Sequence, residues 1–201
     1  ELKNANKSNP EEVITKVQAA IIQTINNKWG VFSRSNIDLL PHQLWVCNQV
    51  LKEWPVRYLV ADDVGLGKTI EAGLMLWSLI ASKIAHRILI LTPAPLTFQW
   101  QERLLNMFDL TFDVFTTEQE NKKINYWKNH SRVIASFPTL AMDNKERREQ
   151  IFESDPWDLV IVDEAHHMNA TERQGKTLQY QFFEDLEEHG KIISTILFTG
   201  T

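Results

Sequence analysis

Two short stretches of the chain carry residue types that could bind and cleave a nucleoside triphosphate. The first, ADDVGLGKTIEAG at residues 61–73, places glycines directly before Lys68 and Thr69. Glycines let backbone N–H groups approach a phosphate closely, a lysine can reach the terminal phosphates, and a threonine hydroxyl can ligate magnesium. The second is Asp163-Glu164, in which one carboxylate could hold magnesium and the other could orient or deprotonate water. Together they predict a site for a nucleoside triphosphate and Mg²⁺.

The first stretch predicts a phosphate-binding loop followed by a helix. Lys68 is expected to reach the β- and γ-phosphates, and Thr69 is expected to ligate magnesium. The strict pattern G-x-x-x-x-G-K-[ST] requires glycine where this chain has Asp62, so by that pattern alone the match fails. The alternative is a glycine-rich turn between a strand and a helix, with an exposed lysine. The residues expected to contact the nucleotide are Asp63, Gly65, Leu66, Gly67, Lys68, Thr69 and Ile70.

The second stretch follows a nearly continuous apolar run, WDLVIV at residues 157–162. Such a run is typical of a central parallel strand that is buried on both faces. The two carboxylates would then lie at the carboxyl end of a strand, where ligands bind in open α/β sheets. We expect Asp163 to hold the metal and Glu164 to position the attacking water. The alternative is a pair of acids that caps the next helix.

Alternating strands and helices must position these two stretches. The strands are expected at 56–61, 87–91, 111–115, 132–136, 157–162 and 192–198, and the helices at 41–54, 68–84, 96–107, 145–153 and 171–188. Alternation at this spacing predicts a mostly parallel central sheet with helices on both faces, a three-layer α/β fold. Residues 1–38 are expected to form a helical extension and linker, and residues 39–201 the nucleotide-binding lobe.

Further motifs give the chain a resemblance to the Swi/Snf branch of helicase superfamily two. The variant A-x-x-x-G-x-G-K-T is the form used in motif I of that group, and DEAHH resembles its motif II. TPAPLTFQW is similar to motif Ia, although Arg103 stands where an acid is usual. LFTGT at residues 197–201 is similar to motif III, and LPHQ at residues 40–43 resembles an adenine-reading glutamine motif. The resemblance covers residues 40–201.

This resemblance implies a RecA-like P-loop NTPase lobe, the first of two in a DNA-dependent ATPase that translocates on double-stranded DNA and remodels bound complexes. It implies that Gln43 reads adenine, because a carboxamide can pair with the N6 amine and N7; the alternative is that Gln43 only packs beside its helix. It also implies that His166, Thr199 and Thr201 couple the nucleotide to motion. Nucleic-acid contacts, made by backbone groups at strand ends, are expected at Thr92, Pro93, Ser136 and Phe137.

The resemblance also suggests partners. WDLVIVDEAHH and the stretch at residues 106–115 are similar in style to bacterial ATPases associated with RNA polymerase, so RNA polymerase or another DNA-bound complex is an expected partner. The sequence ends within motif III, so we expect a monomeric lobe that binds nucleotide but hydrolyses it weakly without a second lobe. A nucleotide-gated scaffold without motor activity is the alternative. The intact phosphate loop and the intact Asp163-Glu164 pair favour the motor.

Composition sets limits on these expectations. Hydrophobic residues at 43% and charged residues at 23% are typical of a globular protein. The net charge of −5 gives no general attraction to nucleic acid, so any DNA contact must be local. The single cysteine, Cys47, suits a core position and a reducing compartment. No apolar run reaches membrane-spanning length and no signal peptide is recognised, which favours a cytoplasmic or nucleoid-associated protein, nuclear in a eukaryote, without a membrane partner.

Three groups of residues have a structural and a functional interpretation. Residues 122–132 interleave basic and aromatic side chains, which could contact nucleic acid, but a solvated amphipathic helix is favoured. Lys145, Arg147 and Arg148 alternate with glutamates, which predicts ion pairs on a helix surface. The seven tryptophans are scattered along the chain, which predicts packing roles rather than a stacking platform.

Overall fold

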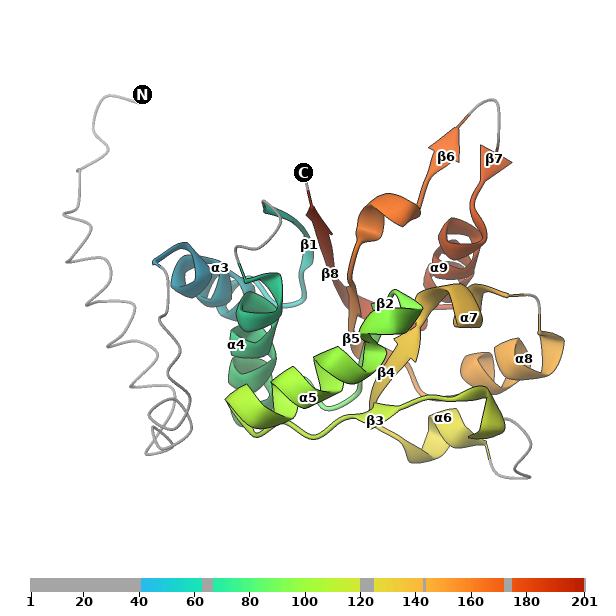
Figure 1. Ribbon diagram of the computed structural model, residues 1–201, viewed down its shortest axis with the longest axis horizontal. Helices are drawn as coiled ribbons and strands as arrows, with labels where there is room; N and C mark the ends of the chain where they lie inside the picture. Colours follow the sequence, from blue (N-terminus) through green and yellow to red (C-terminus); the bar gives the residue numbers. More distant parts are fainter. Residues whose placement is uncertain (1–40, 63–66, 120–124, 143, 172–174, 201) are drawn as a thin grey trace.

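The computed structural model describes residues 41–62, 67–119, 125–142, 144–171 and 175–200 (Figure 1). Several expectations lie outside the described residues. They are the N-terminal helical extension and the site residues Asp63, Gly65, Leu66 and Thr201.

The centre of the fold is a six-stranded sheet in which every pair of neighbouring strands is parallel. The order across the sheet is β1 (Arg57–Asp62), β8 (Ile192–Gly200), β5 (Trp157–Val162), β2 (Ile88–Thr92), β4 (Arg132–Ser136) and β3 (Asp113–Val114). Because all strands run in one direction, their carboxyl ends lie along one edge. The carboxyl ends of β1, β5 and β8 therefore lie on the same side of the molecule.

Helices cover both faces of the sheet. One face packs against α3 (Pro41–Lys52), α4 (Lys68–Ala81) and α5 (Thr97–Phe108), and the other against α6 (Tyr126–Asn129), α7 (Phe137–Ala141), α8 (Lys145–Glu153) and α9 (Leu178–Glu188). Alternate residues of β2 join the two cores, since Ile88 and Ile90 face the first group and Leu89 and Leu91 face the second. The predicted three-layer α/β fold is confirmed.

The remaining elements are short. The described part of the chain contains three 3₁₀ turns, η2 (Ala94–Leu96), η3 (Thr117–Gln119) and η4 (Ala165–His167). Strands β6 (Ala170–Thr171) and β7 (Gly175–Lys176) pair antiparallel and project from the body beside α9 (Figure 1).

Strand β5 is buried on both faces, as its apolar run predicts. Trp157 and Leu159 to Val162 have no exposed surface. The cause is the position of β5 between β8 and β2, with helices above and below. The strand therefore holds the backbone at Asp163 firmly in place.

The predicted helix at 171–188 was wrong at its start. The helix α9 begins at Leu178, because Thr177 accepts a hydrogen bond from the Tyr180 N–H and acts as its N-cap. Gly175 before it has φ of 74°, a left-handed conformation that suits the β6–β7 turn rather than a helix. The helix predicted at 68–84 likewise ends early, at Ala81, before Lys83 with φ of 58°.

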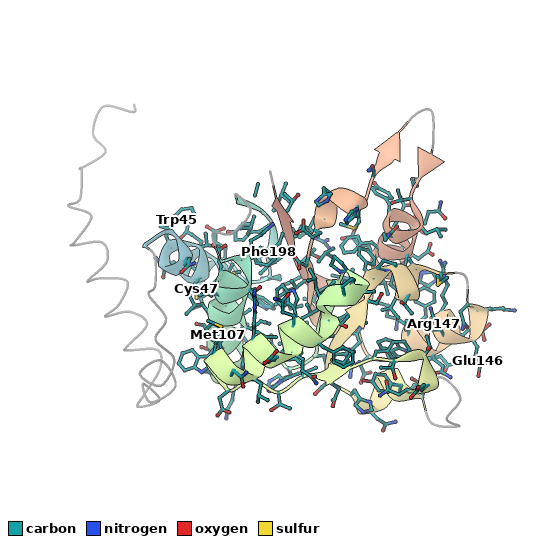
Figure 2. All side chains as sticks on the ribbon, viewed as in Figure 1. Trp45, Cys47, Met107, Glu146, Arg147 and Phe198 are labelled. Atoms are coloured by element: carbon teal, nitrogen blue, oxygen red, sulfur yellow. The ribbon has the colours of Figure 1, made fainter. Side chains whose placement is uncertain are left out.

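The predictions for the basic and aromatic residues at 122–132 and 145–148 are confirmed only in part. Tyr126 and Trp127 are 6% and 1% exposed, so these aromatic side chains belong to the core rather than to a nucleic-acid patch. Lys145 pairs with Glu149 at 3.8 Å, as expected for a surface ion pair. The predicted surface position of Arg147, on α8 (Figure 2), was wrong. Its side chain is 6% exposed and donates a hydrogen bond to the Thr139 carbonyl.

Cys47 and Trp45 test the predictions for the cysteine and for the tryptophans. Cys47 is 1% exposed, and burial raises its pKa to about 11, so its core role is confirmed (Figure 2). Trp45 is 54% exposed, so packing in the core does not account for every tryptophan. None of the described helices has the length and apolar character needed to cross a membrane.

Candidate functional site

Three strand ends bring the predicted site residues together. Strand β1 leads toward α4, whose first residues are Lys68 and Thr69. Strand β5 leads directly to Asp163 and Glu164. Strand β8 lies between β1 and β5 in the sheet, and Thr199 is near its carboxyl end. This edge therefore unites two stretches that are far apart in the sequence.

The start of α4 has the features of a phosphate site. Gly67 precedes the helix with φ of 89°, a left-handed conformation that glycine adopts without strain. The N–H groups of Ile70 and Glu71 bond to the Gly67 carbonyl at 2.7 and 3.1 Å. The N–H groups of Lys68 and Thr69 come earlier in this 14-residue helix, where N–H groups have no partner within the helix and can bind an anion.

The side chain of Lys68, the first residue of α4, is largely buried, and its ammonium group has few polar contacts. Its Nζ atom is buried and makes no hydrogen bond among the described residues. Among the described residues it forms an ion pair with Glu164, whose Oε1 lies 3.6 Å away. A buried ammonium is costly without strong partners, so the arrangement suits a site that receives an anion. The alternative of an exposed lysine on a simple turn is wrong, because the Lys68 side chain is only 12% exposed.

Asp163 is fixed by two hydrogen bonds, one to each carboxylate oxygen. Its Oδ2 accepts from Trp100 Nε1 at 2.9 Å, and its Oδ1 accepts from the Glu164 N–H at 3.0 Å. Burial raises the pKa of the Asp163 carboxyl above its usual value; the bond from Trp100 opposes this rise, and the nearby Glu164 charge adds to it. The carboxylate is 7% exposed and anchored, as a metal ligand should be.

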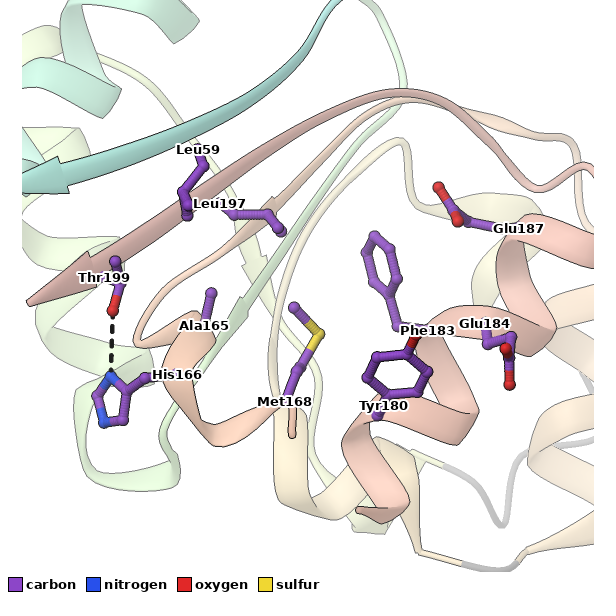
Figure 3. A pocket seen from close by; sticks show the side chains of 10 residues that line it. All are labelled: Leu59, Ala165, His166, Met168, Tyr180, Phe183, Glu184, Glu187, Leu197 and Thr199. Carbon is purple, nitrogen blue, oxygen red and sulfur yellow. Dashed lines mark hydrogen bonds between the residues drawn. The ribbon is translucent and has the colours of Figure 1, made fainter. Parts of the chain in front are cut away.

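Glu164 has an unusual backbone and two charged or polar neighbours. Its φ of 54° is left-handed, which is costly for a residue with a side chain and is found often at functional sites. Its carboxylate lies between Lys68 and His166, with Oε2 3.2 Å from His166 Nδ1. His166 Nδ1 in turn lies 3.4 Å from Thr199 Oγ1, the contact drawn in Figure 3. A continuous polar chain thus runs from Lys68 at the start of α4 to Thr199 of β8.

The side chains of Thr69 and Asp163 offer the oxygen ligands that Mg²⁺ prefers, a hydroxyl and a carboxylate. The Thr69 hydroxyl oxygen also accepts a bond from Arg103 Nη1 at 3.3 Å. Sequence reasoning missed the contacts of Trp100 and Arg103 with this site. The spacing of TPAPLTFQW singled out Trp100, but nothing in the sequence connects it to a carboxylate 63 residues away.

The residues predicted to contact nucleic acid lie at the ends of neighbouring strands, with Thr92 opposite Ser136 in the β2–β4 register. Their side chains are largely turned inward. Thr92 and Phe137 are 0% and 3% exposed, and Ser136 accepts from the Thr139 N–H as the N-cap of α7. Pro93 is half-buried. Contacts from this edge would therefore use backbone groups, and the nucleic-acid role stays a prediction.

A pocket of about 420 Å³ opens beside the polar chain (Figure 3). One side is formed by His166 and Thr199, and the rest is mainly apolar. The apolar lining includes Leu59, Met168, Tyr180, Phe183 and Leu197. It lies on the α9 side of β1 and β8, where Leu59 of the edge strand is 64% exposed.

Gln43 lies in α3 and is 2% exposed. A Cβ atom at Gly67 would come within 3.3 Å of its Nε2, so the amide packs against the residue that begins the phosphate helix. This contact suits either interpretation, a packing residue or an adenine reader placed next to the phosphate loop.

The adenine role predicts a change in base selectivity. In Gln43→Ala, discrimination of ATP over GTP should fall by roughly 10-fold, because a lost pair of hydrogen bonds removes about 1–2 kcal/mol. Calorimetric titration of both nucleotides into both proteins measures it. Asn48→Ala, in the same helix, is the control and should keep the discrimination of the unmodified chain. Unchanged discrimination in Gln43→Ala would leave packing as the role of this residue.

In this parallel sheet, one strand end leads to a helix N-terminus suited to phosphate binding and another leads to a pair of carboxylates. This arrangement is that of a RecA-like ATPase lobe. The profile of the SNF2-related domain matches residues 44–200, and the chain belongs to this family. The resemblance of its motifs to helicase superfamily two is thereby confirmed.

Curated relatives and solved structures agree with this assignment. The chain is 37% identical over 177 residues to the RNA polymerase-associated protein RapA of Yersinia enterocolitica, covering 86% of this chain and 18% of that protein. RapA of Proteus mirabilis is 38% identical, with 81% and 17% covered. The chain thus spans less than a fifth of the length of these relatives.

The solved structures show the same fold. The Sulfolobus solfataricus SWI2/SNF2 ATPase core in complex with double-stranded DNA superimposes with a TM-score of 0.63 at 22% identity, covering 84% of this chain and 33% of that one. The UvsW helicase of bacteriophage T4 gives a TM-score of 0.58 at 14% identity, with 82% and 53% covered.

Proposed function

We propose that this SNF2-family ATPase domain is the nucleotide-binding lobe of a motor that translocates on double-stranded DNA and remodels protein–nucleic-acid complexes. Residues 39–201 would form the lobe and residues 1–38 an extension. The observation that carries the proposal is the meeting of Lys68, Thr69 and the Asp163-Glu164 pair at one sheet edge. These are the residue types that phosphoryl transfer to water requires.

Each residue at the edge has a distinct task in this proposal. Bound Mg-ATP supplies a phosphoanhydride bond and a cation that offsets its charge. Lys68 and the N–H groups at the start of α4 hold the phosphates, and Thr69 and Asp163 hold the cation. Glu164 orients the attacking water and accepts its proton. Gly67 and Ile70 complete the phosphate cradle.

The polar chain from Lys68 to Thr199 supports a coupling role for His166. Glu164 has two partners in the structure, Lys68 at 3.6 Å and His166 at 3.2 Å. When Lys68 turns to the phosphates, Glu164 keeps only the second of these partners. The position of His166, and through it that of Thr199, would then depend on the state of the nucleotide site. Thr201, which lies outside the described residues, is proposed to share the coupling role.

The partners are also part of the proposal. Relatives at 36–38% identity are named as RNA polymerase-associated, and one solved structure of this fold holds double-stranded DNA. We infer that DNA is the track and that RNA polymerase or another DNA-bound complex is the cargo. A cytoplasmic or nucleoid-associated location, or a nuclear one in a eukaryote, would follow. With a net charge of −5, the 201-residue chain by itself would have no general electrostatic attraction to DNA.

Phosphate release with and without duplex DNA tests the motor. The 201-residue chain alone should show little or no stimulation by DNA. A version extended through a second RecA-like lobe should be stimulated strongly, because arginines of that lobe supply roughly 10³- to 10⁵-fold in related phosphoryl transfers. Robust stimulation of the short chain would overturn the two-lobe proposal. An extended version without stimulation would favour the nucleotide-gated scaffold.

A further inference from the structure

Helix α5 contacts the predicted magnesium site twice. Trp100 donates to Asp163, and Arg103, one turn later on the same helix face, donates to Thr69. We propose that Trp100 positions Asp163, the candidate carboxylate ligand of Mg²⁺, that the charge of Arg103 beside Thr69 opposes the cation, and that α5 sets through these two contacts how strongly nucleotide binding depends on Mg²⁺. The inference rests on the proposed ATP site and adds two residues to it.

Trp100 determines the orientation of the Asp163 carboxylate. Its indole is 3% exposed, and its N–H lies 2.9 Å from Oδ2 in a buried environment. The other oxygen is held by the Glu164 N–H, so the carboxylate plane is fixed from both sides. Partners that orient a metal ligand in this way typically contribute 10- to 100-fold to metal affinity. Loss of the indole N–H would leave a buried carboxylate oxygen without its donor.

Arg103 acts in the opposite electrostatic sense. Its guanidinium lies 3.3 Å from the Thr69 hydroxyl oxygen, so it places a positive charge beside a candidate ligand for a cation. That charge favours the nucleotide phosphates and disfavours Mg²⁺. The side chain is exposed, so water screens the effect and it stays modest.

Helix α5 packs closely on α4 at one end and joins the loop after β2 at the other. A Cβ atom at Gly73 of α4 would lie 2.1 Å from the Phe108 ring of α5, so the two helices approach as closely as a glycine allows. At its other end, α5 follows directly on η2 and Pro93, at the end of β2. A shift of this loop would therefore move Trp100 and Arg103 relative to Asp163 and Thr69.

Affinity for a non-hydrolysable ATP analogue, measured by calorimetry with and without Mg²⁺, tests the inference on the full 201-residue chain. The ratio of the two dissociation constants is the Mg²⁺ enhancement. In Trp100→Phe, the enhancement should fall by roughly 10-fold, while affinity without Mg²⁺ changes little. In Arg103→Gln, affinity without Mg²⁺ should fall by roughly 2- to 5-fold and the enhancement should rise.

Two variants serve as controls. Trp157→Phe removes a buried indole whose N–H has no hydrogen-bond partner among the described residues. Arg57→Gln removes an exposed arginine that pairs with Glu187. Both should keep the Mg²⁺ enhancement of the unmodified chain. General damage to the fold would move Trp100→Phe and Arg103→Gln in the same direction, whereas the inference requires opposite directions.

The outcomes separate the inference from the proposed function. If the unmodified chain binds the analogue with a clear Mg²⁺ enhancement and both variants match it, the roles of Trp100 and Arg103 are wrong and the ATP site stands. If Trp100→Phe fails to fold, an unchanged enhancement in Arg103→Gln alone overturns the inference. If the unmodified chain does not bind the analogue, the proposed function itself fails.

Discussion

Lys68→Ala should bind Mg-ATP and Mg-ADP roughly 10- to 100-fold more weakly than the unmodified chain. The variant loses the buried cation beside the start of α4, and bonds to a charged group contribute about 1.5–3 kcal/mol each. The substitution also removes the ion pair between Lys68 and Glu164 at 3.6 Å, so that Glu164 keeps its contact with His166. Calorimetric titration of both nucleotides measures the change.

Lys145→Ala is the matched control for this experiment. It removes the same charge from a side chain that is 89% exposed and pairs only loosely with Glu149, at 3.8 Å. Its nucleotide affinity should equal that of the unmodified chain. If Lys68→Ala also binds nucleotide with undiminished affinity, the loop at residues 61–73 is not the phosphate site.

Glu164→Gln should bind ATP almost normally but hydrolyse it about 10²- to 10⁴-fold more slowly in a protein extended through the second lobe. The amide keeps the size of the carboxylate but cannot take a proton from water. Glutamine also meets the same backbone cost as glutamate at φ of 54°, so the substitution tests chemistry rather than backbone strain. Single-turnover phosphate release, together with a binding titration, separates the two effects.

Glu149→Gln, on the exposed surface of α8, provides the comparison for loss of a carboxylate. It should turn over ATP at the normal rate. A Glu164→Gln protein with the same rate would remove Glu164 from the role of water-positioning residue. A Glu164→Gln protein that no longer binds ATP would instead indicate a structural role.

The sequence predicted the elements that carry local signals. The apolar run at residues 157–162 identified β5, because a strand covered on both faces needs apolar residues at successive positions. The glycine before Lys68 identified the helix start, because the left-handed φ of 89° favours glycine. With parallel strands, these two signals were enough to place Lys68, Thr69 and Asp163-Glu164 at one edge.

Contacts between distant segments could not be predicted in this way. The bond from Trp100 to Asp163 depends on how α5 packs against α4 and against the sheet at β3 and β4, which no local pattern specifies. Arg147 looked like a surface residue because its neighbours are charged, yet its guanidinium satisfies a carbonyl of α7 inside the fold. The start of α9 was missed because its N-cap, Thr177, lies within a polar stretch that could also continue a helix.

The place of β1 in the sheet has a consequence for synthesis. This strand leads into the phosphate loop, lies at the edge and pairs with β8, and Val56 just before it bonds to Ser194, 138 residues further along the chain. A ribosome adds roughly 5–20 residues per second, so about 7–30 s pass between the two strands. Among the described strands β1 pairs with β8 alone, so during that interval it lacks this partner. The nucleotide site therefore assembles only after β8 has been made, although the segment that gives the site its lysine is made early.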